Sequence, residues 1–229
     1  MSKTVINRLV YFVPWVFLLT VVVNLYLIFF FAPEESSQGP VQKIFYFHVA
    51  SAFAMYLGFI VSGVAALVYV IKKTDLSNAL AHAGASVGLV FCSMVLLSGP
   101  LWAKPVWGAY WTWDPRLTTT LILWLVFFAT LLLRKFYGPD QRGRIFAAVF
   151  TLFGVLDIPL VVFAVKVWRG IHPVVLGQEG NMPCEMKATF AFTVFTIIAL
   201  AVIFIFLKTH LLLLEESAHK LEGRISEGI

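Results

Sequence analysis

Six long apolar runs constrain this 229-residue chain more than any other feature of its sequence. A helix that crosses a bilayer needs roughly 20 mostly apolar residues. The strands of a membrane β-barrel are shorter, about 10 residues each, and alternate in character. We therefore predict an all-α integral membrane protein in which residues 1–229 form a single domain. Its six transmembrane helices are expected over residues 9–31, 44–71, 79–101, 117–134, 145–167 and 188–210.

The composition excludes several classes of protein. Hydrophobic residues make up 60% of the chain and charged residues 13%, whereas a soluble domain has about 45–50% and about 25%. This leaves too little charge to cover a water-exposed surface, which argues against a soluble enzyme, a disordered protein or a nucleic-acid-binding domain, and we expect no nucleic-acid partner. The two cysteines, Cys92 and Cys184, are too few for a disulfide framework or a cysteine-rich metal site.

The distribution of lysine and arginine predicts the orientation, because these residues are enriched in cytoplasmic loops. With six spans, both termini lie on one side of the membrane. That side would carry Lys3, Arg8, Lys72, Lys73, Arg134, Lys135, Arg142, Arg144, Lys208, Lys220 and Arg224. The other would carry Lys43, Lys104, Arg116, Lys166, Arg169 and Lys187. We therefore predict cytoplasmic termini and a multi-pass membrane protein surrounded by lipid.

The first apolar run could be mistaken for a secretion signal. It is longer than the apolar part of a signal peptide, and no Ala-x-Ala cleavage site follows it. We expect it to be retained as a helix. The predicted outer loops that could carry chemistry are then residues 102–118 and 168–187.

Residues 102–118 are unusually rich in aromatic side chains: Trp102, Trp107, Tyr110, Trp111 and Trp113 fall within 12 residues. One interpretation is an aromatic belt at the level of the lipid headgroups. The other is a platform for a flat hydrophobic ligand, which several rigid π-faces would hold. Gly108 would let a ligand or a second backbone approach closely.

Two of the five histidines, His48 and His172, lie on the predicted outer side. His82, His210 and His219 are expected to be solvated or interfacial. His48 shares a helix face with small residues of the kind that pack against partner helices, so it should point into the bundle. That face carries Ser51, Ala52, Met55, Ser62 and Ala66.

A lone histidine in a membrane helix is often only a packing residue, but two at one depth beside an aromatic platform suggest a ligand site. Two neutral imidazoles can occupy both axial positions of a haem iron and favour its oxidised state relative to a Met/His pair. The haem propionates would need cations, for which Lys104, Arg116, Lys166, Arg169 and Lys187 are candidates. Zinc would need three or four ligands, and copper with Met182 or Cys184 would leave the aromatic residues unexplained.

Three other residues have structural interpretations. Asp114 followed by Pro115 is typical of a helix start, with Asp114 as N-cap and Pro115 at the first helical position. Asp157 lies inside the fifth span two residues before Pro159. We expect its carboxyl group to satisfy backbone groups that the proline frees, with contact to a partner subunit as the alternative.

The stretch Trp-Gly-Ala-Tyr-Trp-Thr-Trp-Asp-Pro-Arg-Leu-Thr at 107–118 resembles the tryptophan-rich WWD signature of haem-handling proteins. With six spans and one outer histidine on each side of the motif, nearly the whole chain resembles the cytochrome c maturation protein C family (CcmC, haem exporter protein C). Tyr110 stands where that family usually has Trp. The related long synthases have more spans and more histidines.

The resemblance implies a haem-transfer protein of the bacterial inner membrane that acts in cytochrome c biogenesis and loads haem b onto the periplasmic chaperone CcmE. It implies a transfer protein rather than an enzyme, with a haem-attachment activity together with the chaperone as the alternative. It further implies the ATPase CcmA, the membrane subunit CcmB and the one-helix subunit CcmD as partners. His48 and His172 would be the axial ligands of the iron. The remaining haem-binding residues would be Trp102, Lys104, Trp107, Gly108, Tyr110, Trp111, Trp113, Asp114, Arg116 and Arg169.

Three alternatives remain open from the residues alone. The six spans could form a haem-transporting subunit of an ABC-type complex, although the chain has no Walker motif. A b-type electron-transfer cytochrome would hold haem permanently, usually deeper in the spans. A scaffold subunit without a ligand would use the aromatic residues as a partner surface.

Overall fold

The computed structural model describes residues 3–138, 140–168, 170–172 and 182–226, and every regular element in these residues is a helix. A π-helical turn, η1 (Leu27–Phe31), continues the first helix, and a 3-10 turn, η2 (Pro40–Lys43), precedes the second. The α-helices are α1 (Lys3–Tyr26), α2 (Ile44–Lys72), α3 (Asp75–Trp107), α4 (Pro115–Tyr137), α5 (Gln141–Val155), α6 (Asp157–Trp168) and α7 (Cys184–Ser226).

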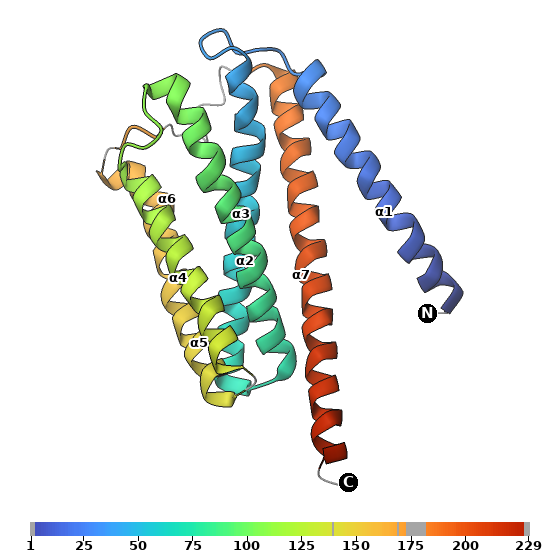
Figure 1. The fold of residues 1–229 in the computed structure, drawn as a ribbon. Helices are drawn as coiled ribbons and strands as arrows, with labels where there is room; N and C mark the ends of the chain where they lie inside the picture. The colour runs from blue at the N-terminus through green and yellow to red at the C-terminus, as the bar shows by residue number, and fades with distance from the viewer. Residues whose placement is uncertain (1–2, 139, 169, 173–181, 227–229) are drawn as a thin grey trace.

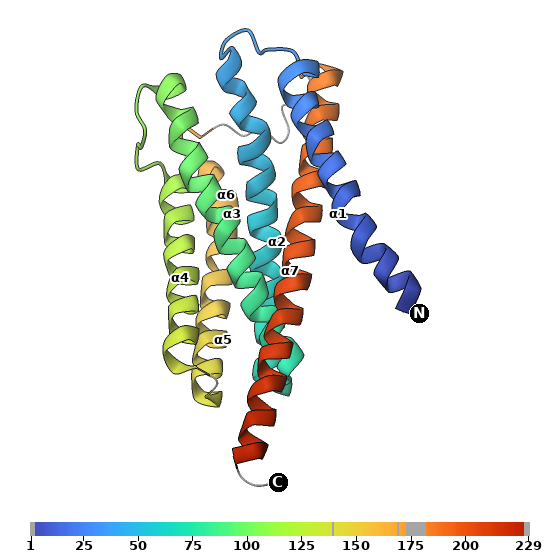
Figure 2. The same cartoon turned by 45° about the vertical axis from the view of Figure 1, so that its right-hand side comes forward.

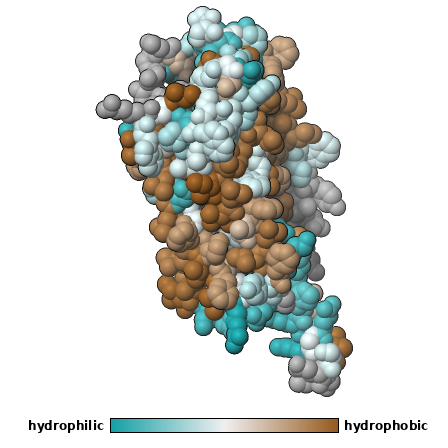
Figure 3. Space-filling model, turned by 60° about the vertical axis from the view of Figure 1, so that its left-hand side comes forward, coloured by the Kyte–Doolittle hydropathy of each residue, from teal (hydrophilic) through white to brown (hydrophobic). Residues whose placement is uncertain are grey.

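These helices contain six segments long and apolar enough to cross a membrane, which confirms the predicted all-α, six-span architecture. On the face shown in Figure 3, a broad hydrophobic band crosses the middle of the molecule, and the surface is more hydrophilic toward its two ends. The protein is thus a multi-pass membrane protein. The end that carries residues 32–39, 108–114 and 170–172 is called the loop end below. The opposite end, which carries Lys72, Lys73, Arg134, Lys135, Arg142 and Arg144, is called the basic end.

Helices α2 to α7 form one bundle, whereas α1 diverges from it (Figures 1 and 2). The C-terminal part of α1 meets α7 near the loop end, where the hydroxyl of Thr193 donates a hydrogen bond to Asn24 Oδ1 (2.8 Å). Further toward its N-terminus α1 exposes apolar side chains such as Trp15 and Leu19. In both views the N-terminus of α1 and the C-terminus of α7 lie toward the basic end.

Helices α2 and α3 approach each other closely because glycines face each other across their contact. A Cβ atom on Gly58 would lie 2.6 Å from the backbone nitrogen of Gly88. A Cβ atom on Gly84 would lie 2.7 Å from the carbonyl oxygen of Gly58. Small residues at helix crossings permit such packing in membranes. Beside this contact Phe59 of α2 stacks on Phe127 of α4, with ring centroids 3.8 Å apart, so the three helices share one core.

The fifth span is broken into α5 and α6 at Leu156. Pro159 has no N–H to donate to the carbonyl of Val155 four residues earlier, which explains why α5 ends there. The predicted role of Asp157 is wrong in one respect: its Oδ2 atom is buried and has no hydrogen-bond partner among the described residues. Asp157 is the first residue of α6, and in the described residues its Oδ2 atom does not bond the backbone groups freed by the break.

Candidate functional site

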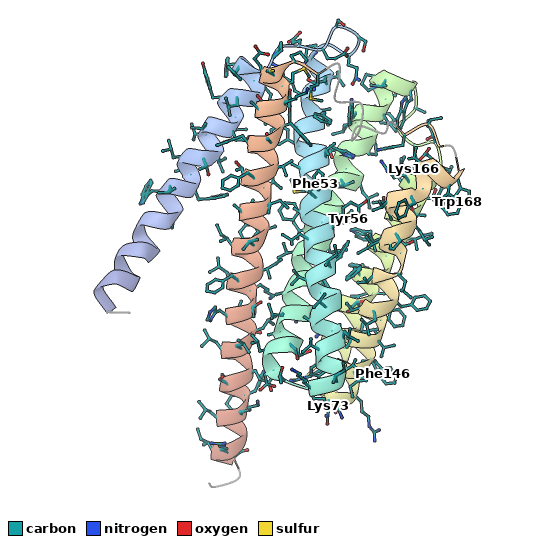
Figure 4. The ribbon with its side chains drawn as sticks, turned by 180° about the vertical axis from the view of Figure 1, so that it is seen from behind. Phe53, Tyr56, Lys73, Phe146, Lys166 and Trp168 are labelled. Atoms are coloured by element: carbon teal, nitrogen blue, oxygen red, sulfur yellow. The ribbon has the colours of Figure 1, made fainter. Side chains whose placement is uncertain are left out.

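A cavity of about 350 Å³ opens among α2, α3, α4 and α6 at the loop end. Both outer histidines and three of the predicted aromatic residues line it, together with Arg116. Its remaining wall is largely apolar and includes Phe53 and Tyr56, which Figure 4 places along α2 below the loop end. Its size falls within the range of about 300–1,000 Å³ that is usual for small-molecule sites.

His48 and His172 meet in this cavity although 124 positions separate them in the chain. Their ring centroids are 6.5 Å apart and the ring planes differ by 39°. Each ring also has a tryptophan edge-on to it: Trp102 lies 5.8 Å from His48, and Trp107 lies 5.9 Å from His172. The prediction that His48 points into the bundle is confirmed, since only 7% of its surface is exposed.

The hydrogen bonds around His48 indicate which of its ring nitrogens is free. Nδ1 lies 2.9 Å from Ser98 Oγ, and the Ser98 hydroxyl donates its single hydrogen to the carbonyl oxygen of Met94 (2.6 Å). Ser98 Oγ must therefore accept from an N–H at Nδ1 of His48. In this tautomer Nε2 carries the lone pair that can bind a metal ion. In metal-binding histidines, a hydrogen-bond partner at the other ring nitrogen commonly fixes the tautomer in this way.

His172 is partly buried, and its Nδ1 atom has no hydrogen-bond partner among the described residues. Burial, together with the positive charge of Arg116, lowers the pKa of His172 to about 4. The imidazole is therefore neutral at neutral pH, the form in which a ring nitrogen can bind a metal.

Asp114 links the aromatic segment to the segment that carries His172. Its Oδ1 accepts from the backbone N–H of Arg116 (2.9 Å), which confirms the predicted N-cap of α4 with Pro115 at the first position. Its Oδ2 accepts from the backbone N–H of Ile171 (2.8 Å). A side chain at Gly170 would collide with this carboxyl group. One buried carboxylate thus holds the start of α4 and the residue next to His172 together.

The predicted loop 102–118 is shorter than expected, because α3 continues to Trp107. Trp102, Lys104 and Trp107 therefore lie on the last turns of a helix, despite Pro100 and Pro105 inside it. The helix ends at Gly108, whose φ of +78° is the left-handed conformation that glycine adopts readily at helix ends. The predicted loop 168–187 is shorter too: Cys184 and Lys187 lie in the first turn of α7.

The predicted aromatic platform divides into two groups. Trp102, Trp107 and Trp111 line the cavity. Tyr110 and Trp113 do not, and their side chains are 57% and 70% exposed. The backbone of Trp113 has a φ of +53°, which is unusual for a residue other than glycine. Its side chain lies at the surface, and its ring is edge-on to the ring of Trp111, with the centroids 5.7 Å apart.

The predicted cations divide in the same way. Arg116 lines the cavity: its Nη2 donates to the carbonyl of Val162 (3.1 Å), and its Nε has no partner among the described residues. Lys104 instead donates to the carbonyl of Gly108 (2.9 Å) and lies over the ring of Tyr110. Lys166 and Lys187 are exposed, and Figure 4 shows Lys166 near the loop end of α6. Arg169 lies outside the described residues.

The family model for heme exporter protein C matches residues 1–224 of this chain. The chain belongs to the heme exporter protein C family. It is 36% identical over 141 residues to "Heme exporter protein C" of Bradyrhizobium diazoefficiens, a match that covers 62% of this chain and 54% of the relative. It is 27% identical over 194 residues to the protein of that name from Escherichia coli, covering 83% and 79%.

The chain is also similar to a third relative. It is the "Putative cytochrome c biosynthesis ccmC-like mitochondrial protein" of Marchantia polymorpha, 30% identical over 158 residues, a match that covers 69% of this chain and 67% of the relative. The chain thus spans about half the length of the Bradyrhizobium relative and about two thirds of the Marchantia one.

Two polar residues of this site, Ser98 and Gln38, were not predicted from the sequence. Ser98 bonds His48, and Gln38 Oε1 accepts from the indole N–H of Trp102 (2.8 Å). The only signal for Ser98 was a hydroxyl in a largely apolar stretch of α3, a signal that Ser86 and Ser93 share. Gln38 comes from the segment between α1 and α2, and nothing in its local sequence distinguishes it from a solvated loop residue.

Proposed function

We propose that this protein binds haem b at the loop end, presents it on the periplasmic face of the bacterial inner membrane, and loads it onto the periplasmic haem chaperone CcmE in cytochrome c biogenesis. CcmA, CcmB and CcmD are the proposed partners. Family membership supports a haem-handling role, and the distribution of lysine and arginine supports an outward-facing loop end. Haem is the cargo that the protein transfers. The iron and vinyl groups of the haem carry the covalent chemistry that follows on the chaperone.

The observation that carries the proposal is the convergence of His48 and His172 inside a cavity walled by tryptophans. Their centroids are 6.5 Å apart. Two imidazoles bound in line to one metal ion through bonds of about 2 Å would have centroids about 6 Å apart. The observed centroid spacing is close to this value and therefore supports a bis-histidine iron site.

The other walls of the cavity fit the periphery of a porphyrin. The indoles of Trp102, Trp107 and Trp111 offer flat apolar surface. The Nε atom of Arg116 is a buried donor without a partner among the described residues, and a propionate carboxylate is the acceptor that a guanidinium binds best. The Trp111 indole N–H also has no partner in the described part of the chain, and it would donate to the second propionate.

Tyr110 and Trp113 suggest where the chaperone binds. Both are large aromatic side chains, exposed beside the cavity wall that Trp111 forms. Exposed aromatic residues of this kind are typical anchors of protein interfaces. We propose that they contact CcmE while it takes the haem edge that faces out of the cavity, so that binding of haem and docking of the chaperone use different aromatic residues.

The decisive experiment is the absorption spectrum of the purified protein. Wild type is expected to carry haem with a low-spin, bis-histidine spectrum, and His48→Ala and His172→Ala are each expected to lose most of it. His210→Ala is the matched control, because His210 is an exposed histidine on α7 away from the cavity. Loss of haem in the control, or none in the two test variants, would contradict the proposal.

Transfer is tested separately by co-expression with the chaperone. Trp111→Ala should reduce haem on this protein and on the chaperone together. Trp113→Ala should leave haem on this protein but reduce the haem passed on. Haem uptake into vesicles containing this chain alone would instead favour the transporter alternative.

A further inference from the structure

A second cavity, of about 230 Å³, lies at the basic end, remote from the histidine pair. It is formed by the start of α3, the turn between α4 and α5, and the part of α7 around Glu216. Polar side chains line most of it, including Asn78, His82 and Arg134, with Leu212 and Leu213 on one side. Nothing in the proposed handling of haem at the loop end uses this cavity.

Arg134 is the unusual residue of this cavity, because it is a buried cation without an anion. Only 9% of its surface is exposed. Its Nη1 donates to Asn78 Oδ1 (2.7 Å), whereas its Nε and Nη2 atoms have no hydrogen-bond partner among the described residues. No carboxylate of these residues lies within 4.0 Å of its guanidinium group. A buried charge without a partner is strongly unfavourable.

The neighbouring acidic residues are already paired with other cations. Asp75 lies 2.6 Å from Lys220 and 3.6 Å from Arg144. Glu216 lies 2.5 Å from Arg144 and 3.6 Å from Lys220. These four residues form a closed network of two acids and two bases. Glu215 also lines the cavity, but its side chain is exposed and makes no ion pair in the described part of the chain.

The free edge of Arg134 has a defined chemistry. Nε–H and one N–H of Nη2 lie side by side on the guanidinium plane and form a fork that matches two oxygens of a phosphate or carboxylate. Asn78 occupies the other side of the group and so fixes its orientation. The cavity lies where α4, a membrane-spanning helix, approaches its end at Tyr137, the depth at which lipid headgroups are found.

The geometry points to an anion site at the basic end, in which the Nε/Nη2 edge of Arg134 binds a phosphate group. That group belongs either to the headgroup of a phospholipid or to free inorganic phosphate, and both present the same pair of oxygens. Leu212 and Leu213 beside the cavity would contact the glycerol and upper acyl region of a lipid.

Two binding measurements on the full chain in maltoside detergent test this site. In the first, native mass spectrometry records how much added phosphatidylglycerol the protein retains. In the second, the thermal unfolding midpoint is followed as inorganic phosphate replaces chloride at constant ionic strength, since a ligand of the folded state raises that midpoint. Arg134→Gln removes the fork. Lys135→Gln removes the same charge one residue away on an exposed side chain and is the matched control.

We expect Arg134→Gln to bind at least tenfold more weakly than wild type in one of the two measurements, and Lys135→Gln to bind like wild type. An effect confined to the lipid measurement identifies a headgroup, and an effect in the phosphate titration identifies the free ion. If Arg134→Gln does not fold, Arg134→Lys takes its place, because it keeps the buried charge and loses the fork. Absence of binding by wild type in both measurements, or equal binding by the Arg134 variant, would overturn the proposal.

Discussion

The two cavities of this bundle differ in the chemistry of their walls although α3 and α4 contribute to both. At the loop end the wall is aromatic and apolar, two imidazoles face each other, and Arg116 is the cation that lines it. At the basic end an ion-pair network adjoins a buried arginine, Arg134, one edge of which has no hydrogen-bond partner in the described residues. The comparison teaches that one helix scaffold can present a flat apolar site and a small oxyanion site at its opposite ends, since the residues that line the two cavities lie at opposite ends of α3 and α4.

The largest effect is expected from a substitution that disrupts both cavities. Gly58→Leu would place a Cβ 2.6 Å from the Gly88 backbone and force α2 and α3 apart. Overpacking of this kind costs about 1–3 kcal/mol and occasionally more, and both cavities lie beside these helices. We expect a lower unfolding midpoint together with loss of haem and phosphate binding. Gly223→Leu is the control, because nothing lies within 4 Å of its Cβ position. Equal midpoints for the two variants would contradict the close packing.

The next largest effects distinguish ligand binding in the two cavities. His172→Ala is expected to weaken haem binding at least tenfold and to leave phosphate binding unchanged, because the imidazole lines only the loop-end cavity. Arg134→Gln is expected to do the reverse. Absorption spectroscopy measures haem binding, and the lipid-retention and phosphate measurements on the same preparations measure binding at the basic end. If either variant altered both ligands equally, the two cavities would not be independent sites.

A smaller effect is expected from Asp114→Ala. It removes an N-cap whose loss costs about 0.5–2 kcal/mol, together with the bond to Ile171 that holds the His172 segment. We expect a lower unfolding midpoint and several-fold weaker haem binding. Asp140→Ala is the matched control, since Asp140 is the N-cap residue of α5 but makes no side-chain cap bond. The interpretation fails if Asp140→Ala destabilises the protein as much as Asp114→Ala.

Trp111 and Trp113 offer a comparison within one short segment. Trp111→Phe shrinks a wall of the cavity and loses a buried N–H donor, so we expect haem to bind a few-fold more weakly. Trp113→Phe alters a side chain that is 70% exposed and should bind haem like wild type. Titration of haem into the two purified variants measures the difference. A larger loss in Trp113→Phe would place the ligand outside the cavity.

An effect of similar size is expected from Ser98→Ala. It removes one hydrogen bond to His48, worth about 1 kcal/mol, which corresponds to about fivefold in haem affinity. The imidazole itself remains, so a bis-histidine spectrum should persist, with a shifted reduction potential because Nδ1 has lost its acceptor. Ser86→Ala is the control, since the Ser86 hydroxyl bonds only a carbonyl of its own helix. An unchanged potential would argue against the tautomer assigned to His48.

Features that depend on a short stretch of chain were predictable. The six apolar runs specify six spans. In lipid every backbone polar group must be hydrogen-bonded within the protein, and a helix achieves this for a single long apolar run. The Asp114-Pro115 pair specifies the start of α4, and the small residues on one face of α2 specify the direction of His48. In each case the information lies within about one or two helical turns.

The tertiary structure alone decided which side chains meet. The sequence did not show that α3 continues to Trp107, that Trp113 turns outward or that Asp114 holds Ile171. It predicted Arg134 as one of several orienting charges, whereas packing buries it beside Asn78 and leaves one edge free. Local pattern determines a helix and its apolar face, but contacts between residues 50 or more positions apart arise only when helices pack, and the two cavities consist of such contacts.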